Sequence, residues 1–119
     1  MSEASAVDRV MLDAVSVDET AVTFEPVAGA SPQQGFHHHI SWATGVTSGV
    51  VTIECADDAD YAGTWAPMAV VNFTTSGNTA PNQDYVYTPG RPRAIRHRIS
   101  TVVAGGVAPS VSTRLVGSL

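Results

Sequence analysis

Lysine is absent from the sequence, and only 14% of the residues are charged. Soluble domains usually carry about 25% charged residues, so part of this surface is either covered by a partner or formed by serine and threonine. The net charge of −5 at pH 7 disfavours binding of nucleic acid by the whole domain. We therefore expect no nucleic-acid partner.

Cysteine is nearly absent as well. Cys55 is the single cysteine, so no disulfide can form within the chain, which fits assembly in a reducing cytoplasm. No apolar run approaches the roughly 20 residues of a membrane span. The first residues, Met1–Ala4, include an acid and lack the apolar stretch of a signal peptide. These absences argue against a disulfide-rich secreted module and against a membrane protein.

Helical periodicity is also missing, because apolar residues do not recur at three- and four-residue spacing over any long window. Instead, short runs of β-branched and aromatic residues alternate with clusters of glycine, proline, asparagine, aspartate and serine. The sequence therefore predicts an all-β fold, an antiparallel, jelly-roll-like β-sandwich of about eight short strands. The predicted strands are Arg9–Val15, Ala21–Val27, Phe36–Ala43, Gly49–Cys55, Ala66–Thr74, Gln83–Thr88, Arg93–Val103 and Ser110–Leu115.

The segments between these strands predict their connections. Gly45–Gly49 is expected to close a hairpin between the third and fourth strands, and Ala28–Gln34 and Ser76–Pro81 to form surface loops. Residues 1–8 are small and polar, and we expect them to form a flexible N-terminal arm. Residues 9–119 then form one β-sandwich domain, since 119 residues suit a single core.

Alternation within the strands predicts which side chains face inward. In the third strand, the even-numbered residues from Phe36 to Trp42 share the apolar face, and His37 and His39 lie on the other. In the seventh strand, His97 shares its face with two isoleucines. The predicted core consists of Phe36, Ile40, Trp42, Val51, Ile53, Trp65, Val71, Phe73, Tyr85, Ile95, Ile99 and Val111.

Potential ligands and nucleophiles lack the spacing of a known site. His37 and His39 can share a metal only with a third ligand from another strand, because neighbours on a strand point to opposite faces. Residues 57–60 hold three aspartates without the spacing or the distal glutamate of a calcium loop, which favours a solvated turn. These carboxylates raise the expected pKa of Cys55 instead of activating it. No nucleophile elbow, P-loop or dinucleotide motif occurs. We therefore expect a protein that is not an enzyme and needs no metal or cofactor.

Four of the six arginines lie within eight residues, from Arg91 to Arg98. Arginine favours planar contacts with carboxylates and is enriched at the centres of protein interfaces. The acidic first half of the chain offers partners within the same chain, namely Glu54 or Asp57 across a sheet, or in a neighbouring copy. Both alternatives remain open. The candidate interface residues are Arg91, Arg93, Arg96, Arg98, His37 and His39.

Aromatic residues allow a different binding function. Tryptophan and tyrosine combine a large apolar area with a polar edge, which suits a platform for sugar rings. Core positions explain most of these aromatics better. The residues concerned are Trp42, Trp65, Tyr61, Tyr85 and Tyr87.

The residue pattern of the chain from Phe36 onward resembles that of small β-sandwich virion proteins of tailed bacteriophages, which include capsid decoration (cement) proteins. The likeness lies in the Thr/Val-rich stretch His39–Cys55, the tryptophan-containing turn Tyr61–Met68, the R-x-R-I strand within Arg93–Ile99, and the final strand Val111–Val116. It covers about two-thirds of the chain and carries no catalytic residues.

This resemblance implies a non-enzymatic structural protein on the capsid surface of the virion, assembled in the host cytoplasm. It also implies a homotrimer that binds the major capsid protein or another virion protein and stabilises the head shell, with the N-terminal arm clamping a neighbour. A tail, baseplate or head-fibre component is the alternative within this class. A glycan-binding β-sandwich module is the alternative from another class.

Overall fold

A computed structural model describes residues 7–25, 35–74, 82–90 and 92–117, which form eight β-strands. No helix capable of crossing a membrane occurs in these four segments. The strands are β1 (Val7–Val10), β2 (Ala21–Phe24), β3 (Gly35–Trp42), β4 (Ser48–Ala56), β5 (Ala66–Asn72), β6 (Gln83–Pro89), β7 (Ala94–Ala104) and β8 (Val111–Gly117).

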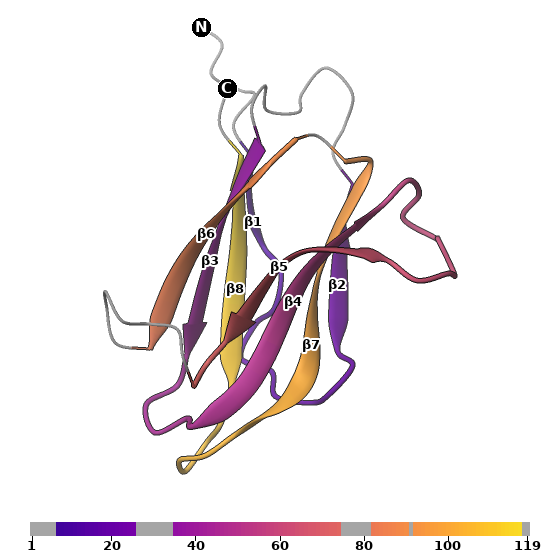
Figure 1. The fold of residues 1–119 in the computed structure, drawn as a ribbon. Helices are drawn as coiled ribbons and strands as arrows, with labels where there is room; N and C mark the ends of the chain where they lie inside the picture. The colour runs from indigo at the N-terminus through magenta and orange to yellow at the C-terminus, as the bar shows by residue number, and fades with distance from the viewer. Residues whose placement is uncertain (1–6, 26–34, 75–81, 91, 118–119) are drawn as a thin grey trace, which may run out of the picture.

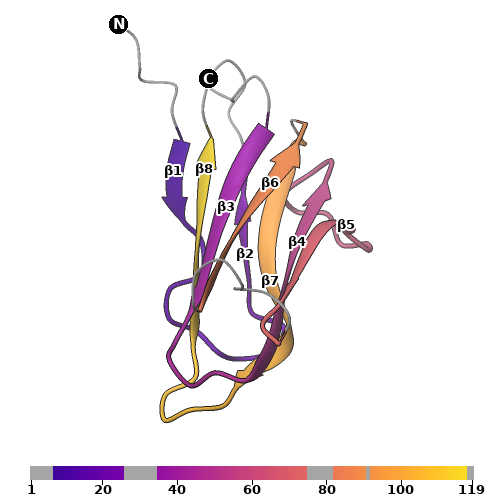
Figure 2. The same cartoon turned by 60° about the vertical axis from the view of Figure 1, so that its left-hand side comes forward.

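The strands form two antiparallel four-stranded sheets that face each other (Figures 1 and 2). Sheet A has the strand order β1-β8-β3-β6, and sheet B has the order β2-β7-β4-β5. Among the described strands, β4 and β5 are the only two that follow each other in the chain and also pair with each other. In every other case, consecutive strands belong to different sheets. This strand order is that of a jelly roll and confirms the predicted fold class.

The predicted hairpin at Gly45–Gly49 is wrong, because β3 belongs to sheet A and β4 to sheet B. The connection crosses the end of the sandwich and buries Val46 in the core. It packs against another connection between the two sheets, the one from β7 to β8. A Cβ added to Gly45 would lie 3.0 Å from the Cα of Gly106. Gly45 has φ 93° and Gly106 φ 81°, so glycine meets both the backbone and the space requirement there.

The predicted first strand, Arg9–Val15, is also wrong in its extent. Strand β1 begins at Val7 and ends at Val10, so Val7 and Asp8 of the expected arm pair with β8. The regular pairing then ends, because Met11 and Leu12 are both buried and do not alternate as strand neighbours do. The chain nevertheless stays hydrogen-bonded to β8 as far as Val15. Residues 1–6 of the expected arm and the expected loops at 28–34 and 76–81 lie outside the described residues.

The core agrees with the alternation in the sequence, with two exceptions. Tyr85 was expected inside and is 70% exposed, because it lies on the outward face of the edge strand β6. Trp65 is buried, at 4% exposure, but lies outside the main core cluster. Two aromatic pairs, Trp42–Phe73 and Phe24–Phe36, pack within the cluster. Its buried members are Met11, Leu12, Phe24, Phe36, Ile40, Trp42, Val46, Val51, Ile53, Val71, Phe73, Ile95, Ile99, Val103, Val111 and Leu115.

Two fully buried histidines join the sheets through the middle of this apolar core. His38 on β3 and His97 on β7 lie 2.8 Å apart, Nδ1 to Nε2. The other ring nitrogens extend this hydrogen-bond chain, with His38 Nε2 2.8 Å from Thr88 Oγ1 and His97 Nδ1 2.7 Å from Thr113 Oγ1. Thr113 Oγ1 also accepts the backbone N–H of Leu12. Every ring nitrogen is thus satisfied, as a buried polar group requires.

The hydrogen-bond chain holds both imidazoles in their neutral form. One proton lies between the two rings, so one ring donates and the other accepts, and each threonine hydroxyl serves the remaining nitrogen. A further proton would place a positive charge in the core, where none of the four hydrogen-bonded side chains is a carboxylate. Burial therefore lowers the pKa of His38 to about 4 and that of His97 to about 3.

We predict that this pair makes the fold sensitive to mild acid. An unfolded histidine takes up a proton near pH 6.5, whereas His38 and His97 in the folded chain do so only near pH 4 and pH 3. The stability is therefore complete above pH 6.5 and is lost as the pH falls below it, by about 2 kcal/mol per histidine at pH 5. Urea unfolding between pH 7.5 and pH 5 measures this slope.

The double variant His38→Leu/His97→Leu serves as the comparison, because it removes both buried bases together. Its free energy of unfolding should change little over the same range. An equal slope in both proteins would show that other groups cause the acid sensitivity.

Candidate functional site

The predicted interface residues lie on opposite faces of the sandwich. Arg96 and Arg98 project from β7 on the outer face of sheet B, and His37 and His39 project from β3 on the outer face of sheet A. Arg93 is exposed just before β7, and Arg91 lies outside the described residues. One flat partner cannot contact both faces at once, so the two groups are separate surfaces.

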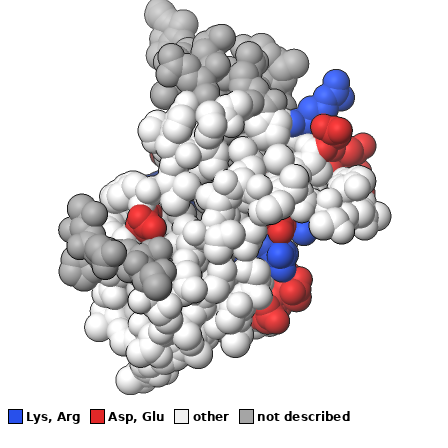
Figure 3. Space-filling model, in the orientation of Figure 1, with Lys and Arg blue, Asp and Glu red and all other residues white. Residues whose placement is uncertain are grey.

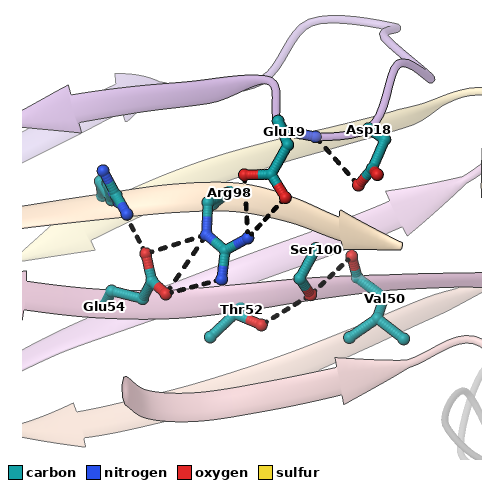
Figure 4. A network of polar contacts seen from close by, with 8 residues as sticks. Asp18, Glu19, Val50, Thr52, Glu54, Arg98 and Ser100 are labelled. Carbon is teal, nitrogen blue, oxygen red and sulfur yellow. Dashed lines mark hydrogen bonds and ion pairs between the residues drawn. The ribbon is translucent and has the colours of Figure 1, made fainter. Parts of the chain in front are cut away.

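The outer face of sheet B holds an ion cluster centred on Glu54 of β4 (Figure 4). Arg96 Nε lies 2.6 Å from Glu54 Oε1, and Arg98 Nη2 lies 3.0 Å from Oε2. Arg98 also reaches Glu19, at 3.3 Å. The neighbouring Thr52 and Ser100 hydroxyls are 2.8 Å apart. The pairing of Arg96 and Arg98 is thus intramolecular, one of the two alternatives that the sequence leaves open.

Trp65 covers the cluster from one side. The guanidinium of Arg96 lies 4.5 Å from the centroid of the indole ring, and Trp65 donates its Nε1–H to the carbonyl oxygen of Tyr61. Burial raises the pKa of Glu54, but hydrogen bonds and charge from Arg98 and Arg96 outweigh it, so its pKa lies below the usual value. Glu54 therefore stays ionised and holds two arginines in place, which gives this face a structural role.

Charged side chains are concentrated on one side of the face that Figure 3 shows. In the view of Figure 3 they gather at the right, where Figure 1 places β2, β4 and β7, and most of the remaining visible surface carries none. The aspartates of residues 57–60 lie in the connection from β4 to β5, where Asp58 accepts the N–H of Asp60. This matches the solvated turn predicted from the sequence. Burial and the charge of Asp57 raise the pKa of the half-buried Cys55 thiol, as also expected.

The outer face of sheet A is a polar and aromatic surface arranged in three rows across the strands. The registers of β6, β3, β8 and β1 place directly opposed residues side by side. Because directly opposed side chains project from the same side of a sheet, all members of a row lie on the outer face of sheet A. The rows are Gln83–Ser41–Ser112, Tyr85–His39–Arg114–Val10, and Tyr87–His37–Val116–Asp8.

Two tyrosines dominate one side of this surface, and each packs against a histidine. Tyr85 stacks on His39 with ring centroids 4.5 Å apart and an angle of 16°, and Tyr87 lies 4.8 Å from His37 at 49°. The orientation of the His39 ring is fixed by Gln83, because His39 Nε2–H donates to Gln83 Oε1 at 2.8 Å. Tyr85 is 70% exposed and Tyr87 46%. We call these four rings, Tyr85, Tyr87, His37 and His39, the aromatic platform.

A hollow of about 310 Å³ adjoins the aromatic platform on the side of β8 and β1. His39 belongs to both features, since one face stacks on Tyr85 and its edge lines the hollow. Serine hydroxyls and three ionisable side chains form most of the wall. The lining residues are Val10, Asp13, His39, Ser41, Ser112, Thr113 and Arg114.

The described residues contain no group of three potential ligands that could hold a metal ion. His37 and His39 lie on one face, as the alternation predicts, but each packs on a tyrosine. Their arrangement suits an aromatic surface better than a metal site.

The sequence interpretation missed the aromatic platform as a site. It named both tyrosines as possible sugar ligands and placed Tyr85 in the core. The usable signal is their spacing: Tyr85 and Tyr87 are two residues apart and therefore share a strand face. That β6 is an edge strand opposite the histidines follows only from the pairing of β3 with β6.

Comparisons with known proteins give a likeness of fold. No protein-family model matches the chain, and no curated protein matches it in sequence. A solved structure of chitosan-binding module 1, derived from a chitosanase/glucanase of Paenibacillus sp. IK-5, is similar, with a TM-score of 0.54 and 18% identity. The alignment covers 92% of this chain and 76% of that one.

Two further solved structures align with the chain. A selenomethionine-labelled point mutant of the same module gives a TM-score of 0.53, with 18% identity over 91% of this chain and 75% of that chain. RmlC from Streptococcus suis gives 0.36, with 11% identity over 96% and 44%, and a score this low supports no inference. At these identities the comparisons establish the β-sandwich fold.

We predict that Glu54 stabilises sheet B far more than an exposed ion pair stabilises sheet A. Glu54→Gln removes a nearly buried charge and leaves two arginines without their partner, so the free energy of unfolding should fall by about 1–3 kcal/mol. Asp8→Asn breaks the exposed Arg114–Asp8 pair and should cost under about 1 kcal/mol. Urea unfolding of both variants at pH 7 measures the difference. Equal effects would show that Glu54 has no special structural role.

Proposed function

We propose that this protein is a non-catalytic glycan-binding module that holds sugar chains on the outer face of sheet A. The observation that supports the proposal is the aromatic platform, in which two exposed tyrosines are each packed against a histidine on one face. Exposed aromatic rings in a group are uncommon on a soluble surface unless they bind something. Here they adjoin a polar hollow, which is the usual combination in a ligand site.

The chemistry of the face fits a sugar ring. The C–H groups of one side of a pyranose pack on an aromatic ring, while its hydroxyls need hydrogen-bond partners around the edge. Tyr85 and Tyr87 supply ring area at low cost in conformational entropy, and stacking on the histidines restricts them further. Ser41, Ser112 and Arg114 supply donors and acceptors beside the rings.

The likeness to a chitosan-binding module supports the proposal through the fold alone. It makes chitosan and related β-linked amino-sugar chains the first ligands to try. The tryptophans that the sequence suggested as ligands are not part of the proposed site, because Trp42 packs on Phe73 in the core and Trp65 is covered by Arg96.

We predict that Tyr85→Ala weakens binding of chitosan oligosaccharides at least tenfold, the loss of about 1.4 kcal/mol. The reason is that Tyr85 is the most exposed tyrosine of the aromatic platform and offers its free side to a ligand. Isothermal titration calorimetry with oligosaccharides of defined length measures the change.

Tyr61→Ala is the matched control, because Tyr61 is 49% exposed but lies in the connection from β4 to β5, away from the aromatic platform. Its affinity should equal that of the unaltered protein. Equal losses in both variants, or no binding of any glycan on an array by the unaltered protein, would refute the proposed function.

The virion hypothesis stays a prediction. Two of the interface residues expected for it, Arg96 and Arg98, are paired with Glu54 of the same chain. Light scattering coupled to size exclusion, together with binding assays, separates the two functions. A stable trimer that binds expanded capsids and no glycan would favour the virion protein, and a monomer that binds sugars would favour the module.

A further inference from the structure

We propose that Asp13 binds the ammonium group of an amino sugar and so makes the site selective for cationic glycans. The inference rests on the proposed function, because it needs a sugar chain on the aromatic platform. It adds the class of ligand and the residue that selects it.

The first support is the balance of charge in the hollow. Arg114 Nε lies 2.8 Å from Asp8 Oδ1, so these two charges largely compensate each other. Asp13 lines the same hollow, and no hydrogen bond or ion pair joins its carboxylate to another of the described residues. The remaining charge of this part of the face is therefore negative. A carboxylate that none of the described residues pairs favours a cationic donor over a neutral amide.

The second support is the rigid placement of Asp13. On one side, Leu12 is bound to β8 through its N–H, which donates to Thr113 Oγ1, and its carbonyl, which accepts the N–H of Thr113. On the other side, Ala14 has φ 52°, a left-handed conformation that is rare for a residue with a Cβ. Its N–H donates to Ser112 Oγ at 3.0 Å. The chain thus holds a strained turn that keeps Asp13 at the wall of the hollow.

The third support is the line from the aromatic platform to the hollow. Tyr85, His39 and Arg114 are direct neighbours across β6, β3 and β8. Adjacent strands are about 4.8 Å apart, so Tyr85 and β8 are separated by about 10 Å. That separation exceeds the width of one sugar ring. Because His39 covers the face of Tyr85 that is nearer to β8, a sugar unit stacked on the other face is followed by units that pass over His39. A unit beyond the next one then lies over the hollow, within reach of Asp13.

The test compares two ligands that differ only at the nitrogen: β-1,4-linked glucosamine oligosaccharides and the N-acetylated oligosaccharides of the same length. Titration at about pH 6, where such an amine is charged, gives the ratio of the two affinities. Asp13→Asn should weaken binding of the glucosamine oligosaccharide about tenfold and leave the N-acetylated one unchanged. Asp13→Glu keeps the charge and should retain most of the preference.

Asp60→Asn is the control for net charge, because it removes the same charge from the connection between β4 and β5. It should leave the ratio of affinities unchanged. Tyr85→Ala should weaken both ligands together. A ratio that is unchanged in Asp13→Asn overturns the selectivity while the aromatic platform stands. Failure of the unaltered protein to bind either ligand refutes the proposed function and this inference with it.

Discussion

Burial of one face of each sheet against the other decides where every side chain of the eight strands lies. The two sheets share a core that includes Phe36, Ile53 and Leu115, and the buried His38–His97 hydrogen bond joins them through its middle. Because strand neighbours alternate, fixing the inner face also fixes the outer one. The outer faces of the sandwich are therefore consequences of its core.

The two outer faces differ in how far their polar and aromatic side chains are already paired within the protein. On sheet B, Glu54 is almost buried and holds Arg96 and Arg98, and Trp65 covers the first of these. The charged side chains of that face are thus paired with one another, and few of their hydrogen-bonding groups are left for a partner molecule. On sheet A, exposed tyrosines and a polar hollow leave ring faces and donors toward the solvent. The contrast is why the outer face of sheet A carries the proposed binding site.

The residues predicted for the core show which buried positions the periodicity of the sequence can predict. Ile40, Val51 and Ile99 are buried as expected, because apolar residues at a spacing of two mark the inner face. Tyr85 fails this rule: aromatic character favours burial, but its strand face points outward on an edge strand. The turn at Gly45 fails for a related reason, since a glycine-rich turn serves a hairpin and a crossing between sheets equally well.

The sequence by itself determined the fold class, most strand positions and the inward direction of His38 and His97, because these follow from local spacing and turn residues. Only the tertiary structure decided that the two histidines meet, that Arg96 and Arg98 share Glu54, and that Tyr85 lies beside His39. Each of these contacts joins residues more than 40 positions apart. Such pairings depend on which strands become neighbours in each sheet, and no local pattern in a single sequence specifies that choice.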